Sequence, residues 1–181
     1  MRVIAGEWRG RRIEAPPGRA TRPTGDRARE GLFSMLQSRL GGFEGLEVAD
    51  LFAGTGALGL EALSRGAARC TFVERDPAAL DALARNVARL GAGGRAEIRR
   101  QAIEQAALPP RPCDLILIDP PYGRGLAGTA LDRIAAGGWL ASGGWVSLET
   151  EGIAPPLPPG LARDAERRFG KAHLLLMRAE S

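Results

Sequence analysis

Short apolar runs alternate along the middle of the chain with segments whose apolar residues recur at helical spacing. Strands are predicted at 46–52, 69–74, 96–100, 113–119 and 145–150, and helices at 56–65, 77–90 and 126–136, with a short helix after the third strand. The run at 113–119 is almost wholly apolar, which is typical of a central strand covered on both faces. Strands that alternate with helices in this way predict an α/β fold built on a doubly wound, parallel sheet.

The N-terminal part of the chain follows another pattern. Arg2–Ala5 and Arg12–Ala15 flank a glycine-containing turn and predict a short hairpin with an exposed Trp8. The proline- and glycine-rich stretch 16–25 is a predicted loop. A helix is predicted to begin at Asp26, because apolar residues then recur at helical spacing until a pair of glycines stops it.

The last two predicted strands, at 161–169 and 172–178, have no helix between them. They predict an antiparallel hairpin at one edge of the sheet. The length of 181 residues suits a single domain of about 100–200 residues with a small appendage. We therefore expect an N-terminal extension over 1–42 and a main domain over 43–181.

The composition is that of a globular protein, with 44% apolar and 25% charged residues. No apolar stretch approaches the roughly 20 residues needed to cross a bilayer, and the N-terminus lacks the pattern of a secretory signal. Cys70 and Cys113 lie in apolar runs and are expected to be small buried residues in a reducing compartment. We expect a cytoplasmic protein without a membrane partner.

Positive charge is concentrated near the N-terminus. Residues 1–39 hold nine arginines and four acidic residues, a net charge of +5, whereas the remainder of the chain carries −1. A GC-rich genome explains why arginine is used in place of lysine, but it does not explain where the surplus lies. A localised face that binds a polyanion does.

Between the first predicted strand and the helix that follows it, Gly54–Gly59 matches the pattern G-x-G-x-x-G. Glycine allows a sharp turn and a close approach of the backbone to a ligand, and the following helix N-terminus favours hydrogen-bond acceptors or negative charge. The pattern fits dinucleotides, adenosyl cofactors and some purely structural turns.

Polar groups also follow the second and third predicted strands. Glu74 stands 20 positions after Gly54, where an acidic side chain is placed to accept hydrogen bonds from both hydroxyls of a ribose. Gln101 and Ala102 follow the third strand, where an adenine edge would lie. This spacing favours a cofactor that contains adenosine and does not separate NAD from S-adenosylmethionine.

The segment after the central strand, Asp119-Pro120-Pro121-Tyr122, is more specific. Two prolines fix the backbone and remove two N–H donors, so the carbonyl groups beside them can face a pocket without competing donors. A carboxylate and a fixed carbonyl can accept the two hydrogens of an exocyclic amine, and the Tyr122 ring can stack on a planar base. This arrangement favours a substrate base that carries an amino group.

These segments resemble a known family. Asp50–Gly59 resembles motif I of class I S-adenosylmethionine-dependent methyltransferases, and Asp119–Tyr122 resembles their [DNS]-P-P-[YF] motif for amino groups on nucleic-acid bases. With RPTGDRARE at 22–30, LFAGTGALGLEALSRGA at 51–67 and GWL at 138–140, the chain is similar to the type D guanine-N2 methyltransferases of bacterial 16S ribosomal RNA. The resemblance extends over essentially the whole chain.

The resemblance implies a Rossmann-like, seven-stranded, mostly parallel sheet whose last strand is antiparallel. It implies S-adenosylmethionine as cofactor, no metal, and methyl transfer to N2 of guanine 966 in 16S ribosomal RNA. Its cofactor residues carried over to this chain are Asp50, Phe52, Gly54, Gly56, Glu74, Gln101 and Ala102, with Glu74 at the ribose and Gln101-Ala102 at the adenine. Asp119, Pro120 and Tyr122 would position the target guanine.

For the RNA, we expect phosphate contacts from the N-terminal arginines Arg2, Arg9, Arg11, Arg12, Arg22 and Arg27. Arg29 lies two positions after Arg27 on the predicted helix, so the two do not share a face, and Arg29 is expected to pair with an acidic group instead. The expected partner is 16S ribosomal RNA within a partly assembled small ribosomal subunit, bound by a monomeric protein.

Three alternatives remain open. A DNA adenine-N6 or cytosine-N4 methyltransferase shares the Asp119–Tyr122 motif, although 181 residues leave no room for a separate DNA-recognition domain. An NAD-dependent oxidoreductase shares the glycine loop and Glu74 but needs a second substrate domain. An RNA-binding assembly factor without catalysis has no need of Asp119 or of an unbroken glycine loop.

Overall fold

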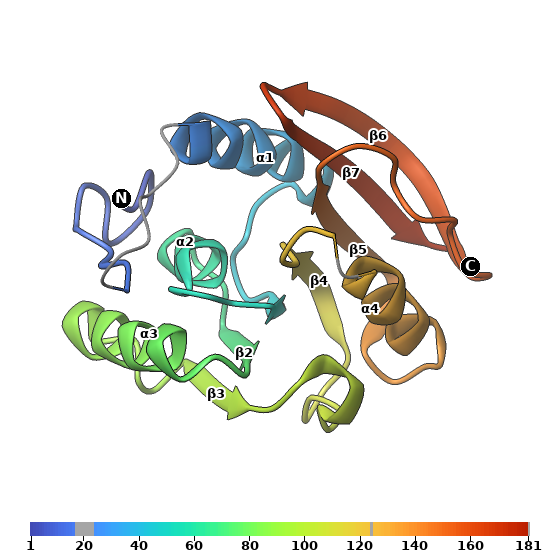
Figure 1. Ribbon diagram of the computed structural model, residues 1–181. Helices are drawn as coiled ribbons and strands as arrows, with labels where there is room; N and C mark the ends of the chain where they lie inside the picture. Colours follow the sequence, from blue (N-terminus) through green and yellow to red (C-terminus); the bar gives the residue numbers. More distant parts are fainter. Residues whose placement is uncertain (17–23, 124, 181) are drawn as a thin grey trace.

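A computed structural model describes residues 1–16, 24–123 and 125–180 of the protein (Figure 1). One seven-stranded sheet has the order β3-β2-β1-β4-β5-β7-β6. Its strands are β1 (Glu47–Leu51), β2 (Arg69–Glu74), β3 (Ala96–Arg100), β4 (Cys113–Ile118), β5 (Leu140–Thr150), β6 (Leu161–Phe169) and β7 (Ala172–Ala179). The helices are α1 (Thr24–Leu40), α2 (Ala57–Ser64), α3 (Pro77–Leu90), the short 3₁₀ helix η1 (Ile103–Gln105) and α4 (Leu126–Ala135).

The first five strands are parallel, whereas β7 runs antiparallel to β5 and β6 antiparallel to β7. The predicted doubly wound sheet and its C-terminal hairpin are thus confirmed, and the topology is that of a Rossmann-like methyltransferase fold. The order of the strands reverses between β1 and β4. In open α/β sheets a crevice forms outside the carboxyl ends of the strands at this point.

The sheet lies between two apolar layers, and β4 shows how one strand serves both. Leu115 and Leu117 belong to the core shared with the first three helices, whereas Ile116 and Ile118 belong to the core shared with α4 and η1. Because successive side chains of a strand point to opposite faces, a strand covered on both sides must be apolar throughout. This accounts for the run of apolar residues that predicted a central strand.

The start and end of α3 follow directly from its sequence. Asp76 caps the helix by accepting a hydrogen bond from the Ala79 N–H at 2.8 Å, and Pro77 occupies the first helical position. Gly91 ends the helix with φ 71°, a left-handed conformation that favours glycine. The predicted bounds of this helix are confirmed.

The N-terminal segment forms the predicted short hairpin, but its tryptophan is placed differently from the prediction. Arg2 and Arg12 form an antiparallel bridge, and the backbone N–H groups of Val3 and Ile13 each donate to a carbonyl of the opposite arm at 2.9 Å. Trp8 is buried, not exposed: its ring lies 4.9 Å from the Arg95 guanidinium carbon, and its backbone N–H donates to Ser64 Oγ at 3.0 Å. The segment packs on the helical layer, and Figure 1 shows it beside α2 and α3.

The anchor of this segment is a buried acid in α2. Glu61 is fully buried and accepts hydrogen bonds from the N–H groups of Ile4 at 2.8 Å and Ala5 at 3.0 Å. Its other partner is the Arg65 guanidinium, at 2.8 Å. A buried carboxylate is tolerated only with such partners, so Glu61 joins the extension to the main sheet.

Two elements begin two or more residues before their predicted starts. The first helix begins at Thr24, two residues before Asp26, which lies within its first turn. β5 begins at Leu140, five residues before the predicted start, because Leu140 pairs with Cys113 before a bulge restores the register at Trp145. Glycines in a strand often mark such a bulge, and Gly143 here has φ 69°.

The two cysteines are free thiols and are buried, as predicted. Burial raises the pKa of the Cys113 thiol to about 12. Within the three described ranges, no helix is long and apolar enough to cross a bilayer.

Candidate active site

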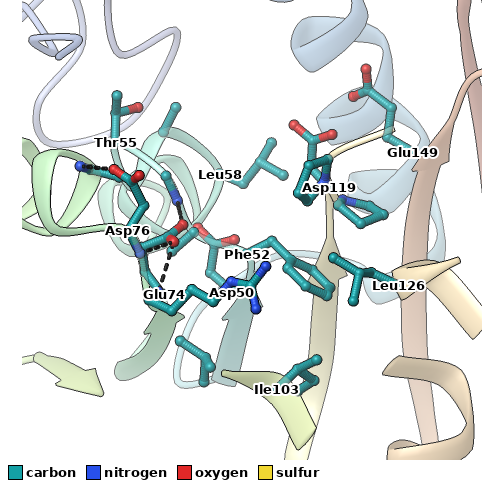
Figure 2. Close-up of a pocket in the computed structure, with 18 of the residues that line it drawn as sticks. Asp50, Phe52, Thr55, Leu58, Glu74, Asp76, Ile103, Asp119, Leu126 and Glu149 are labelled. Atoms are coloured by element: carbon teal, nitrogen blue, oxygen red, sulfur yellow. Dashed lines mark hydrogen bonds between the residues drawn. The ribbon is translucent and has the colours of Figure 1, made fainter. Parts of the chain in front are cut away.

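A cavity of about 770 Å³ opens at the carboxyl ends of the parallel strands, which is a usual size for a small-molecule site. Figure 2 shows it between two groups of acidic side chains, with Glu74 and Asp76 on one side and Asp119 and Glu149 on the other. The predicted site residues that line it are Asp50, Phe52, Gly54, Glu74, Gln101, Ala102, Asp119, Pro120 and Tyr122. The structure therefore brings the carboxyl ends of four strands to one cavity.

The loop after β1 is held in an uncommon conformation. Phe52 has φ 64°, in the left-handed region that non-glycine residues rarely adopt. Such backbone strain is usually kept where a functional geometry requires it. Gly54 has φ 56°, and a Cβ added there would meet only the Phe52 carbonyl oxygen, at 4.0 Å. The cavity thus has open space beside the backbone of Gly54.

Gly56, predicted to touch a cofactor, lies behind this loop and does not line the cavity. Its N–H donates to the Ala53 carbonyl at 2.7 Å. A Cβ at Gly56 would approach a methyl group of Leu83 to 2.4 Å. The missing side chain therefore serves packing between the loop and α3, and contact of Gly56 with a cofactor stays a prediction.

Glu74 closes the glycine loop as well as lining the cavity. Its Oε2 accepts from the Gly54 N–H at 2.8 Å, and its Oε1 accepts from the N–H groups of Arg75 at 2.7 Å and Asp76 at 2.8 Å. An ionised carboxylate has about four acceptor sites, so these three bonds leave about one, on Oε2. A ligand hydroxyl is therefore expected at Oε2, in place of the two that the sequence predicted for the whole group.

Asp50 is buried at the bottom of the cavity, where its carboxyl accepts from the Gly59 N–H at 2.9 Å. Burial raises its pKa well above the usual value, against the opposing effect of the Gly59 hydrogen bond; the charges of Asp119 and Glu74 raise it further. A positively charged ligand group would reverse this effect and favour the ionised form. The interior of the cavity is thus suited to a cation.

The raised pKa of Asp50 predicts how stability depends on pH. Asp50 contributes most below its usual pKa of about 4, and the contribution is lost as the pH rises through the raised pKa. Asp50→Asn keeps an acceptor for Gly59 and removes the ionisable group. In thermal melts without ligand, we expect the Tm of the variant, relative to that of the wild type, to rise as the pH is increased above about 4. A difference that is constant with pH would contradict the assignment.

The segment Asp119–Tyr122 follows β4 directly. Asp119 is exposed to the cavity, Pro120 is buried, and Tyr122 is partly buried. The Tyr122 hydroxyl donates to Glu149 Oε1 at 3.4 Å. Glu149, near the end of β5, is a cavity residue that sequence reasoning missed. Its position near the carboxyl end of a parallel strand was the available signal.

The basic extension lies at the rim of the same cavity, which Met1, Ala15, Pro16, Gly25, Asp26 and Arg29 also line. Arg29 is buried and donates to the Arg2 carbonyl at 2.5 Å and to Asp26 at 3.1 Å, so its predicted pairing with an acid is confirmed. The side chains of Arg2 and Arg11 are exposed but bonded to the carbonyls of Gly10 and Arg89.

Three other predicted RNA contacts are placed as exposed side chains. Arg9, Arg12 and Arg27 are exposed, and their side chains make no ion pair within the described part of the chain. Arg22 lies outside the described residues.

Comparison with known proteins places the chain in a family. The family model described as conserved hypothetical protein 95 matches residues 1–178. "Ribosomal RNA small subunit methyltransferase D" of Escherichia coli is 37% identical over 183 aligned residues, covering 100% of this chain and 91% of the relative.

Solved structures agree with this relationship. The Escherichia coli protein yhhF superposes with a TM-score of 0.88 at 36% identity, covering 99% of this chain and 98% of that one. Magnesium protoporphyrin IX methyltransferase from Synechocystis, solved with bound SAM, shares the fold at a TM-score of 0.69 and 15% identity, over 90% of this chain and 87% of that one. The chain therefore belongs to the conserved hypothetical protein 95 family, the family of the small-subunit ribosomal RNA methyltransferases of type D.

Proposed function

We propose that the protein transfers the methyl group of S-adenosylmethionine to the exocyclic N2 of a guanine in small-subunit ribosomal RNA, guanine 966 by the family resemblance. The observation that carries the proposal is that Asp119, Pro120 and Tyr122 share one cavity with Glu74 and the strained glycine loop. The name of the Escherichia coli relative supports ribosomal RNA as the substrate class.

The donor set of the cavity fits this cofactor. The buried Asp50 carboxyl suits the positive charges of a sulfonium and an ammonium group, and Gly54 leaves room for them. Glu74 would accept from a ribose hydroxyl at Oε2, and Gln101 and Ala102 would lie at the adenine. The cofactor, when bound, supplies a methyl group that is already activated for transfer.

The protein's task is then to align the acceptor amine. Asp119 and the Pro120 carbonyl would accept its two hydrogens, which favours a pyramidal nitrogen and stabilises the positive charge that develops in the transition state. Stacking on Tyr122 would offset part of the few kcal/mol needed to take the base out of its stack. Such positioning can contribute roughly 7–11 kcal/mol in favourable cases.

RNA affinity is assigned to the exposed arginines of the extension 1–42. Changing Arg9, Arg12 and Arg27 together to Gln is expected to weaken RNA binding and to lower the slope of log K against log salt by about 2, because each phosphate contact contributes roughly 0.7–0.9. The measurement is a salt titration of binding to small-subunit RNA. Cofactor affinity should not change.

A matched control changes three exposed arginines at the edge of the sheet opposite the cavity to Gln. Arg69 and Arg111 lie at or just before the starts of β2 and β4, and Arg178, on the antiparallel strand β7, lies opposite Trp145 of β5. This variant should keep the salt slope of the wild type. Equal slopes for all three proteins would contradict the assignment of RNA binding to the extension.

The proposed function is tested by two measurements on the purified protein. Calorimetry should detect binding of S-adenosylmethionine and none of NAD, which separates a methyltransferase from an oxidoreductase. Methyl-labelled cofactor should then label small-subunit RNA, either naked or in partly assembled particles. Binding of NAD alone, or cofactor binding without transfer to either RNA form, would contradict the proposal.

A further inference from the structure

Glu149 and Asp119 lie opposite each other at the carboxyl ends of the neighbouring strands β5 and β4. In the parallel pairing of β4 with β5, Ile118 lies opposite Leu148, so the next residues along the two strands are Asp119 and Glu149. Both line the cavity. Figure 2 shows the two carboxylates close together on the same side of the cavity.

The position of Glu149 is restrained from two directions. Its backbone lies in a strand paired on both sides, with Leu174 of β7 opposite it. Its Oε1 accepts from the hydroxyl of Tyr122, the proposed stacking ring. The acceptor group is therefore placed relative to the stacking ring.

We propose that Glu149 selects guanine by accepting a hydrogen bond from the ring N1–H of the target base. This inference rests on the proposed function, in which Asp119 and the Pro120 carbonyl accept the two N2 hydrogens. The Watson–Crick edge of guanine carries N1–H and the N2 amine side by side, as three donors in a row. Two adjacent carboxylates and a carbonyl are the complementary set of acceptors.

The same set disfavours the other amino-bearing bases. Beside its amine, adenine presents an unprotonated N1 and cytosine an unprotonated N3, and both are acceptors. A carboxylate that faces either lone pair is repelled and loses its hydration without gaining a hydrogen bond. Glu149 thus supplies a physical reason for guanine as substrate, where the Asp119–Tyr122 motif alone also permits adenine and cytosine.

The test changes the N1–H donor on the base and, separately, the Glu149 acceptor on the protein. Small-subunit particles are reconstituted with RNA that carries either guanine or 2-aminopurine at the methylated position; 2-aminopurine keeps the N2 amine but has an unprotonated N1. The wild type is expected to prefer guanine in kcat/KM by roughly 10- to 100-fold, the usual effect of losing a hydrogen bond to a charged group.

Glu149→Gln keeps an oxygen acceptor for Tyr122 and adds an amide donor that can meet an unprotonated N1. We expect this variant to lose activity on guanine and to gain relative activity on 2-aminopurine, so that the preference falls at least tenfold. Glu151→Gln is the matched control, because Glu151 is an exposed acid two residues away that does not line the large cavity. It should keep the preference of the wild type.

Equal losses on both bases in Glu149→Gln would overturn the inference, because a merely structural role lowers both rates alike. An unchanged preference in Glu149→Gln, or the same change in Glu151→Gln, would overturn it as well. If the wild type methylates neither RNA, the proposed function falls and this inference falls with it. If the wild type methylates guanine and Glu149→Gln keeps the same preference for guanine, the proposed function stands and only the role of Glu149 is overturned.

Discussion

Replacement of Asp119 by Ala is expected to lower kcat for methyl transfer by roughly 100- to 1,000-fold. The expected size is that of removing one preorganised group that stabilises charge in a transition state. Asp119 follows the central strand and lies in the cavity wall, across from the glycine loop and Glu74 (Figure 2). Because the change leaves those elements intact, the dissociation constant of S-adenosylmethionine is expected to change by less than about tenfold, far less than kcat; the charge of Asp119, which also acts on Asp50, is the part that cofactor binding loses.

The measurement is a single-turnover assay on small-subunit particles, combined with calorimetry of cofactor binding. Asp81→Ala serves as the control, because Asp81 is an exposed aspartate on α3 that does not line the cavity. Its turnover should match that of the wild type. Turnover of Asp119→Ala within about threefold of the wild type would remove Asp119 from the mechanism.

Replacement of Glu74 by Gln is expected to weaken binding of S-adenosylmethionine by roughly 100-fold. Three backbone N–H groups, of Gly54, Arg75 and Asp76, now share one carboxylate. Gln has a single carbonyl oxygen, so its amide nitrogen must face at least one of these donors and leave it unpaired. These donors are partly buried or exposed, so an unpaired one costs no more than about 1 kcal/mol, the low end of the range for buried donors. The larger part of the loss comes from the ribose, which loses a charged acceptor worth about 1.5–3 kcal/mol.

Calorimetry with S-adenosylmethionine and with 5′-methylthioadenosine measures this effect. Both ligands contain the ribose, so both should lose affinity, and the Tm should fall with them. Glu97→Gln, a change on β3 that affects only the surface pair with Arg99, should leave both affinities unchanged. If Glu74→Gln binds both ligands with the affinity of the wild type, the carboxylate holds the glycine loop and does not bind the ribose.

Elements whose ends depend on local chemistry were predicted closely. The bounds of α3 follow from the Asp76 cap, the proline after it and the glycine that ends the helix. β2 and β3 were likewise predicted residue by residue. In contrast, the start of β5 depends on a bulge whose pairing involves Cys113, a residue distant in sequence. Pairing of this kind leaves no local pattern.

In the candidate site, too, local features were predicted and contacts between distant segments were missed. The predicted site residues lie at or just after the carboxyl ends of the parallel strands, so the topology alone placed Asp50, Glu74 and Asp119 together. The buried state of Trp8 was missed because its partners Ser64 and Arg95 are far along the chain. The triple use of Glu74 was missed because it depends on how the loop folds back.

Gly56 and Glu149 show opposite failures of sequence patterns: a motif residue outside the cavity and a cavity residue outside any motif. Gly56 matched a cofactor pattern, but its glycine is required by the approach of Leu83, which no local pattern records. Glu149 belongs to no motif, yet the strand register places it level with Asp119. Sequence patterns thus identified residues that belong to a recognisable motif and overlooked those, such as Glu149, whose role depends only on strand register.

The chemical identity of the modified nucleoside tests the central claim most directly. Small-subunit particles are incubated with the protein and methyl-labelled S-adenosylmethionine, and their RNA is digested to nucleosides and separated by liquid chromatography with mass detection. The cavity chemistry predicts that all protein-dependent label is in N2-methylguanosine. Label in N6-methyladenosine or N4-methylcytidine, or no label at all, would contradict it.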